Sequence, residues 1–189
     1  QPLKEEYLLT SPLEETNQWY AIAKISGVKL IDAIRKQYGY NYVSLMPTNL
    51  YGPNDNYNLK TSHVLPALIR RFHDAKLKKQ DVSVWGTGKI LREFLHVDDL
   101  AEAILFFINN KAEESTYNVG SGEEVTINKL ALLVKEKIRF EGKINYDSTY
   151  PDGTPRKFLD SSRIKKLGWK SSISLEKGID ITYENFLKN

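Results

Sequence analysis

Tyr20 and Lys24 are the residues of this 189-residue chain whose types and spacing most directly suggest chemistry. They occur in the stretch WYAIAK, which begins at Trp19. A spacing of four residues places both side chains on one helix face, where the ammonium group lies beside the phenol. A free tyrosine titrates near pH ~10 and an adjacent positive charge favours the phenolate, so the pair can transfer a proton. The pair predicts an acid/base site, the alternative being an exposed tyrosine and lysine on a helix.

Local patterns around this pair predict how it is positioned. Apolar residues recur at helical spacing over residues 20–38, with Asn17 as the N-cap and Gly39 as the stop. A strand is predicted at 42–46, and the segment 47–56 that follows it is rich in turn-forming residues. Ligands of open α/β sheets bind at the carboxyl ends of strands, so we expect this loop to line a site.

The rest of the chain alternates between helix and strand patterns, which favours an α/β fold. Helices are predicted at 63–77, from Asp98 or Asp99 to 109, from Ser121 or Thr126 to 138, at 161–167 and at 175–187, and strands at 82–85, 93–97 and 116–119. His73 is expected on the surface and His96 in a structural role. The glycine pairs at 86–88 and 120–122 lack the third glycine and following helix of a dinucleotide-binding loop.

Composition narrows the class of protein. The net charge of +3 is spread along the chain, and the basic stretch 76–79 suits a helix end better than a nucleic-acid patch. The chain has no cysteine, which excludes disulfides, zinc thiolates and cysteine nucleophiles within it. Signal-peptide and membrane-span patterns are absent, so we expect a cytoplasmic protein. The sequence opens at Gln1 without an initiator methionine, which suggests part of a longer protein.

Three motifs in a fixed order carry a family resemblance. They are the Tyr20 and Lys24 pair, NLYGP at 49–53 and REFLHVDD at 92–99. Together they resemble the extended short-chain dehydrogenase/reductase superfamily that modifies nucleotide sugars. The resemblance implies the C-terminal part of a Rossmann-type, doubly wound parallel sheet with a smaller mixed α/β substrate-binding lobe.

The detailed sequence of segments 46–56 and 62–73 resembles the GDP-L-fucose synthase family, and this resemblance extends over essentially the whole chain. That family is implied to convert GDP-4-keto-6-deoxy-D-mannose to GDP-L-fucose, by epimerising C3 and C5 and reducing the C4 ketone with NADPH. Met46 stands where many sugar-nucleotide epimerases have arginine, which favours this reading. The alternatives are another nucleotide-sugar 4-epimerase or 4,6-dehydratase, or a non-catalytic fragment that binds a sugar nucleotide.

The resemblance also assigns roles to residues. Tyr20 would donate the proton to the C4 oxygen, Lys24 would hold the nicotinamide ribose, and His63 would be the acid of the epimerisation. NADP would contact Tyr20, Lys24, Pro47, Thr48, Asn49, Leu50 and His63. The GDP-sugar would contact Arg71, Trp85, Arg92 and Asp152. The plainer alternatives are a solvated His63, a core Trp85 and an Asn49 that stabilises a turn.

Domain organisation and assembly follow from the same resemblance. Rossmann-type elements are expected mainly at 18–60 and 92–120, and the substrate lobe mainly at 61–91 and 121–189. The family's glycine-rich half, catalytic serine and epimerising cysteine would precede Gln1, so the chain alone is expected to have little or no activity. A homodimer through the helix that carries Tyr20 and Lys24 is also implied.

Overall fold

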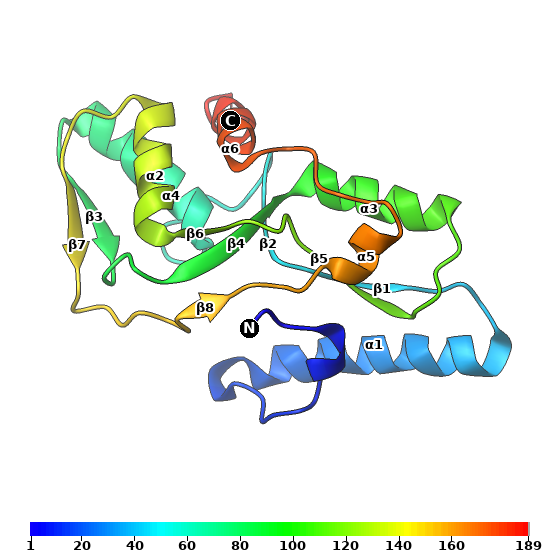
Figure 1. Ribbon diagram of the computed structural model, residues 1–189. Helices are drawn as coiled ribbons and strands as arrows, with labels where there is room; N and C mark the ends of the chain where they lie inside the picture. The colour runs from blue at the N-terminus through cyan, green and yellow to red at the C-terminus, as the bar shows by residue number, and fades with distance from the viewer. Residues whose placement is uncertain (189) are drawn as a thin grey trace.

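The computed structural model describes residues 1–188, which form short strands covered by helices (Figure 1). In chain order the elements are the 3-10 helices η1 (Glu5–Tyr7) and η2 (Glu15–Asn17), then α1 (Gln18–Tyr38), β1 (Ser44–Pro47), β2 (Asn49–Tyr51), α2 (Val64–Lys78), β3 (Val82–Trp85), β4 (Leu91–His96), α3 (Val97–Asn109), β5 (Thr116–Val119), β6 (Glu124–Thr126), α4 (Ile127–Ile138), β7 (Ile144–Asp147), β8 (Arg156–Lys157), α5 (Ser162–Lys166) and α6 (Leu175–Phe186). Each predicted helix is present, and its ends agree with the prediction to about two residues.

Parallel strand pairs form the framework. β1 pairs with β5 from Ser44 opposite Thr116 to Pro47 opposite Val119, and β3 pairs with β7 in the same parallel sense. β4 pairs in parallel with β2 and β8, and antiparallel with β6. Parallel neighbours need long crossover connections, which the helices between them supply. The predicted α/β fold with parallel strands is confirmed.

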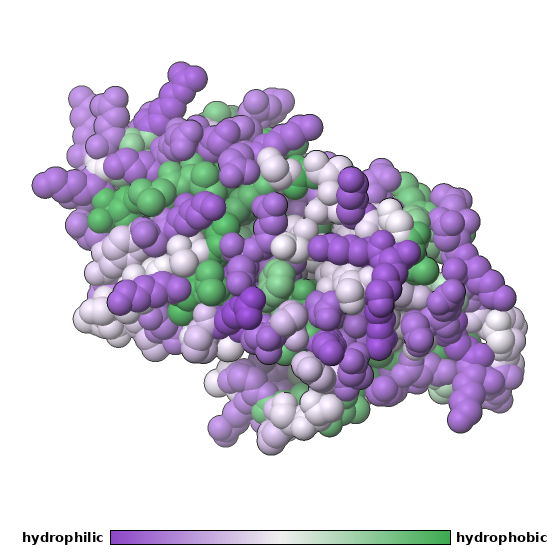
Figure 2. All heavy atoms as spheres, in the orientation of Figure 1, coloured by the Kyte–Doolittle hydropathy of each residue, from purple (hydrophilic) through white to green (hydrophobic). Residues whose placement is uncertain are grey.

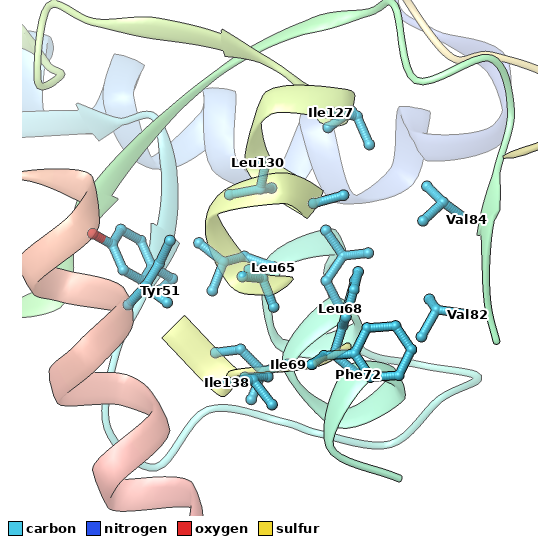
Figure 3. Close-up of a cluster of buried hydrophobic side chains, with 14 of the residues drawn as sticks. Tyr51, Leu65, Leu68, Ile69, Phe72, Val82, Val84, Ile127, Leu130 and Ile138 are labelled. Carbon is cyan, nitrogen blue, oxygen red and sulfur yellow. The ribbon is translucent and has the colours of Figure 1, made fainter. Parts of the chain in front are cut away.

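Two hydrophobic clusters pack on either side of β4. The larger one lies between α2, α4 and β3 (Figure 3) and includes Tyr51, Leu65, Leu68, Ile69, Phe72, Val82, Val84, Phe94, Leu130 and Ile138. The second lies around β5, α3 and α5 and includes Leu95, Ala103, Phe107, Tyr117, Val119 and Ile164. Successive residues of a strand point to opposite faces, so Phe94 serves one cluster and Leu95 the other. β4 therefore contributes side chains to both hydrophobic clusters.

α1 lies on the outside of the molecule, at the bottom of Figure 1, and none of its residues is buried. Its second half is tethered to the segment before β5. The carboxylate of Asp32 accepts from the hydroxyl of Ser115, and Arg35 donates to the backbone oxygen of Ala112 at 3.1 Å. Gly39 ends the helix in the left-handed conformation, as predicted.

The surface is mixed, with apolar side chains exposed among polar ones (Figure 2). On α1, Trp19 is 74% exposed and Leu30 59% exposed, and on α3, Ile108 is 70% exposed. These apolar side chains are left uncovered by the described residues. Within residues 1–188, no helix is long and apolar enough to cross a membrane.

Three predictions of local structure were wrong, because contacts with distant parts of the chain determine the structure at these positions. Residues 49–51 form a strand rather than loop, since they pair with β4. The N-cap of α3 is His96, whose ring Nδ1 accepts from the N–H of Asp98 at 3.3 Å, rather than either aspartate. His73 is partly buried, and its Nδ1 lies 3.0 Å from the hydroxyl of Tyr183 on α6.

Lys79 is a position where glycine should stabilise the fold. It follows the last residue of α2 and has a φ of 53°, a conformation that costs a side chain with a Cβ atom about 1–2 kcal/mol. We expect Lys79→Gly to raise the free energy of unfolding by roughly 0.5–1 kcal/mol, after allowance for the added entropy of the unfolded chain. Urea denaturation measures this change in the free energy of unfolding. Lys78→Gly, inside the helix, is the matched control and should lower stability by roughly 0.5–1 kcal/mol; a loss at both positions contradicts the argument.

Candidate functional site

The predicted acid/base pair lies near the start of α1. Lys24 Nζ is 5.4 Å from the centroid of the Tyr20 ring, so the ammonium faces the phenol as the spacing predicts. The Tyr20 side chain is 61% exposed, and neither group has a hydrogen bond or ion pair among the described residues. Asn17 occupies the N-cap position, although its side chain accepts no capping bond. The pair is therefore free to contact a ligand.

The predicted cofactor segment 47–50 spans the end of β1 and the start of β2. Thr48 N–H donates to Val119 O at 3.0 Å, and its hydroxyl donates to Glu93 O at 3.2 Å. The Asn49 amide also donates to Glu93 O, at 2.7 Å. Asn49 thus joins the start of β2 to the backbone of β4 rather than stabilising a turn, and the segment is held at the carboxyl end of a parallel strand.

His63 occupies the N-cap position of α2, with an exposed side chain and no capping hydrogen bond. No contact within residues 1–188 joins its ring to Tyr20 or Lys24. The described residues thus place the reductive pair and the epimerisation acid on separate elements. The assigned roles of all three residues stay predictions.

The four predicted substrate residues, in contrast, gather around one loop, residues 148–155, between β7 and β8. The Trp85 ring stacks on Tyr150 of this loop, with centroids 4.4 Å apart and planes 10° apart. The guanidinium carbon of Arg71 lies 4.2 Å from the Trp85 centroid, and Arg71 Nη1 donates to Ser83 O at 3.3 Å. Trp85 is 50% exposed and is not the core residue that its alternative reading describes.

Further along the same loop, Asp152 accepts from both the backbone N–H and the hydroxyl of Thr87, at 2.9 and 2.6 Å. These hydrogen bonds lower the pKa of Asp152, so the carboxylate is ionised at neutral pH. Arg92 Nη1 donates to Thr154 O at 2.7 Å. The loop therefore contacts the turn that follows Trp85 through Asp152, and Arg92 of β4 through Thr154.

Arg71 and Arg92 have no carboxylate partner within residues 1–188; their hydrogen bonds go to backbone oxygens. Desolvation by burial lowers the pKa of both guanidinium groups. Arginine nevertheless stays protonated in proteins, so both are uncompensated cations. Such forked donors suit phosphate oxygens, and the arrangement can bind an anion beside an aromatic surface.

Glu93 is a buried acid that connects the segments around the site. Its side chain is 0% exposed; Oε1 accepts from Gly122 N–H at 2.8 Å and Oε2 from Leu159 N–H at 3.1 Å. Burial raises the pKa of Glu93, while these backbone N–H groups favour its carboxylate form. Its backbone oxygen is the acceptor for Thr48 and Asn49 described above. One residue thus links three segments.

Sequence reasoning missed Tyr150, Thr87 and Glu93. Tyr150 lies in a loop with no recognised motif, and Thr87 is a turn residue whose partner is distant in sequence. Glu93 does occur in the motif at 92–99, and a carboxylate within an otherwise apolar strand pattern was the signal that could have found it. A buried charge needs partners, which implies a structural network.

Comparison with known proteins assigns this sequence to a family. The sequence profile of the NAD dependent epimerase/dehydratase family matches residues 1–120. The chain belongs to this family. It is 57% identical over 190 residues to GDP-L-fucose synthase 1 of Arabidopsis thaliana, a match that covers 100% of this chain and 59% of that protein. The chain thus spans about three fifths of this relative's length.

Solved structures give the same result for the fold. The GDP-L-fucose synthetase of Naegleria fowleri bound to NADP superposes with a TM-score of 0.91 at 30% identity, covering 100% of this chain and 61% of that one. A GDP-D-glycero-L-gluco-heptose synthase of Campylobacter jejuni, in the presence of NADPH, gives 0.91 at 33% identity and covers 99% and 65%. The predicted Rossmann-type α/β class is confirmed.

Gly86→Ala should break the junction between Trp85 and the loop. Gly86 has a φ of +78°, and a Cβ atom there would lie 2.3 Å from Asp152 Oδ1. We expect a loss of about 2 kcal/mol in the free energy of unfolding, from left-handed strain and the displaced carboxylate. Gly27→Ala, where a Cβ atom meets nothing within 4 Å, is the control. Equal thermal stability of wild type and Gly86→Ala contradicts this packing.

Glu93→Gln tests the buried acid. The amide keeps one acceptor oxygen but turns its NH₂ group toward a second backbone N–H donor, which leaves that donor unpaired in the interior. We expect the free energy of unfolding to fall by about 1–3 kcal/mol. Chemical denaturation measures the loss, with the exposed Glu123→Gln as the control. A neutral Glu93→Gln would show that the two N–H bonds do not support the fold.

Proposed function

We propose that the chain is the C-terminal part of an NADPH-dependent GDP-L-fucose synthase. This enzyme would epimerise C3 and C5 of GDP-4-keto-6-deoxy-D-mannose and reduce the C4 ketone. The observation that carries the proposal is the joint presence of a free tyrosine–lysine pair and an uncompensated arginine–tryptophan cluster. They occur in a chain that is 57% identical to a protein named GDP-L-fucose synthase 1.

The residues present fit a nicotinamide cofactor. Lys24 is an exposed ammonium that no carboxylate of the described residues neutralises, which suits ribose hydroxyls and a phosphate-bearing ligand. We assign NADP binding to Tyr20, Lys24, Pro47, Thr48, Asn49, Leu50 and His63. The cofactor, when bound, supplies the hydride for the C4 carbon. The solved neighbour from Naegleria fowleri has NADP bound, and the one from Campylobacter jejuni was determined in the presence of NADPH.

The chain's own residues then provide the proton chemistry. The Tyr20 hydroxyl donates a proton to the C4 oxygen as that carbonyl becomes an alcohol, and the adjacent Lys24 ammonium stabilises the phenolate left behind. In the epimerisation the His63 imidazolium protonates the carbanion carbon beside the ketone, a step that suits an imidazole near neutral pH. Tyr20 and His63 therefore act on different atoms of the sugar.

The cluster around loop 148–155 holds the GDP portion in this proposal. Arg71 and Arg92 pair with the diphosphate, because both are cations without a carboxylate partner within residues 1–188. Trp85 gives an exposed flat surface for a ring. Asp152 orients the turn next to Trp85 through Thr87, and the outer lone pairs of its carboxylate accept from a substrate hydroxyl.

Domain division and assembly belong to the same proposal. We divide the chain into a Rossmann part at 18–60 and 92–120 and a substrate lobe at 61–91 and 121–189. Most residues of the two hydrophobic clusters follow this division, whereas Tyr51 and Phe94 pack with the substrate lobe and Ile164 and Trp169 pack with the Rossmann part. The exposed apolar residues of α1 support a homodimer through that helix. A cytoplasmic location stays an expectation from the sequence patterns, and a multifunctional enzyme one from the family resemblance.

Turnover by the intact protein is the direct test. With GDP-4-keto-6-deoxy-D-mannose, wild type should oxidise NADPH and form GDP-L-fucose. Tyr20→Phe should lower reduction by about 10²–10⁴-fold, because the proton donor is lost. His63→Gln should stop C3 and C5 epimerisation, followed as deuterium uptake from D₂O. Tyr38→Phe, at the far end of the same helix, is the matched control.

Other outcomes separate the alternatives. Oxidation of NADPH without C3 and C5 exchange contradicts the epimerase role of His63. Turnover of a different nucleotide sugar, with no net NADPH oxidation, favours a 4-epimerase or 4,6-dehydratase. Binding of GDP-sugars by a catalytically silent intact protein favours the non-catalytic reading.

A further inference from the structure

The stacked pair of Trp85 and Tyr150 is placed where a ligand can reach it. Trp85 ends β3, and its Cα partner across the parallel pair is Asp147, the last residue of β7. Tyr150 follows three residues later and covers the indole with nearly parallel rings. Trp85 is 50% and Tyr150 42% exposed, so the two rings form a step on the surface rather than a core contact.

Anchors on either side hold Tyr150 in this position. Before it, the Thr149 hydroxyl donates to Asp147 Oδ1 at 2.6 Å. After it, Asp152 binds Thr87 through two hydrogen bonds. The Tyr150 hydroxyl itself has no hydrogen-bond partner within residues 1–188. The loop therefore presents a fixed aromatic ring with one face against Trp85 and a hydroxyl that lies close enough to Arg71 for an electrostatic interaction.

The positive charge of Arg71, next to the stacked rings of Trp85 and Tyr150, fits a nucleotide ligand. The Arg71 guanidinium lies on the Trp85 ring and has no acidic partner within residues 1–188. A hollow of about 280 Å³ opens beside it, lined in part by Leu59, Arg71, Ser83 and Trp85. A cation over the Trp85 ring, next to the exposed Tyr150 ring, suits a ligand that carries phosphate at one end and a planar ring at the other.

We propose that Tyr150 selects the nucleobase: the purine of the nucleotide sugar stacks on the outer face of Tyr150, with Trp85 behind it. This rests on the proposed function for the presence of a nucleotide. The space between Tyr150 and Trp85 is already filled at 4.4 Å, so the outer face is the one that a base can use without breaking the stack. A purine covers more of the tyrosine ring than a pyrimidine, so Tyr150 favours GDP over UDP.

Calorimetric titration of the intact protein with GDP, UDP and inorganic pyrophosphate tests this, and it needs no turnover. Tyr150→Ala should weaken GDP binding by about tenfold, within the range that stacking on an aromatic side chain contributes. UDP binding should weaken by a smaller factor, so the ratio of the GDP affinity to the UDP affinity should fall. Tyr150→Phe, which keeps the ring, should restore GDP affinity to within about twofold of wild type. Pyrophosphate, which has no base, should bind wild type and Tyr150→Ala equally.

One control variant accompanies this titration, and several outcomes would contradict the inference. Tyr40→Ala removes a tyrosine that stacks on Tyr38 and belongs to no proposed site, and it should leave all three affinities unchanged. Unchanged or tighter GDP binding by Tyr150→Ala overturns the inference, and so does an equal loss for pyrophosphate, which would indicate collapse of the loop. Absence of GDP binding to wild type also overturns it. GDP binding that depends on Tyr150, in a protein that does not turn over the proposed substrate, refutes the proposed function and keeps the inference.

Discussion

The buried carboxylate of Glu93 is the constraint on which much of this architecture depends. A charge taken out of water needs hydrogen-bond donors, and Glu93 obtains them from the backbone of Gly122 and Leu159. These two residues follow β5 and β8, so the carboxylate adds side-chain contacts to the pairing of β4 with β6 and β8. Gly120 shows how tightly the site is built, because a Cβ atom there would lie 2.4 Å from Glu93 Oε1. Any larger residue at that position would displace the acid.

This network also explains why β4 is the strand that unites the molecule. Phe94 faces the cluster of α2 and α4, and Leu95 faces the cluster of α3 and β5, so side-chain alternation joins two cores. Between them the Glu93 backbone oxygen fixes the proposed cofactor segment through Thr48 and Asn49. Glu93 therefore holds the proposed cofactor segment, while Arg92 next to it contacts the proposed substrate loop through Thr154.

Periodicity and capping residues predicted the helices and the main strands, because those signals are local. β2, β6, β7 and β8 escaped prediction because each is short and exists through pairing with a distant partner. Of the site, the spacing of Tyr20 and Lys24 suggested that pair and the family resemblance supplied the other candidate residues, whereas Tyr150 and its stack on Trp85 required the fold. Local sequence does not encode which loops meet at a sheet edge.

The pairing of β3 with β7 is the step that creates the aromatic cluster. Both strands end at the same edge, so the residues after Trp85 and after Asp147 must meet there. β3 alternates between buried and exposed residues, with Val84 buried and Trp85 exposed. A shift of one residue in the pairing would turn Trp85 into the core and Val84 outward, because side chains alternate with a period of two. Exposure of Trp85 is thus a property of strand register, and core packing of Val82 and Val84 holds the ligand surface in place.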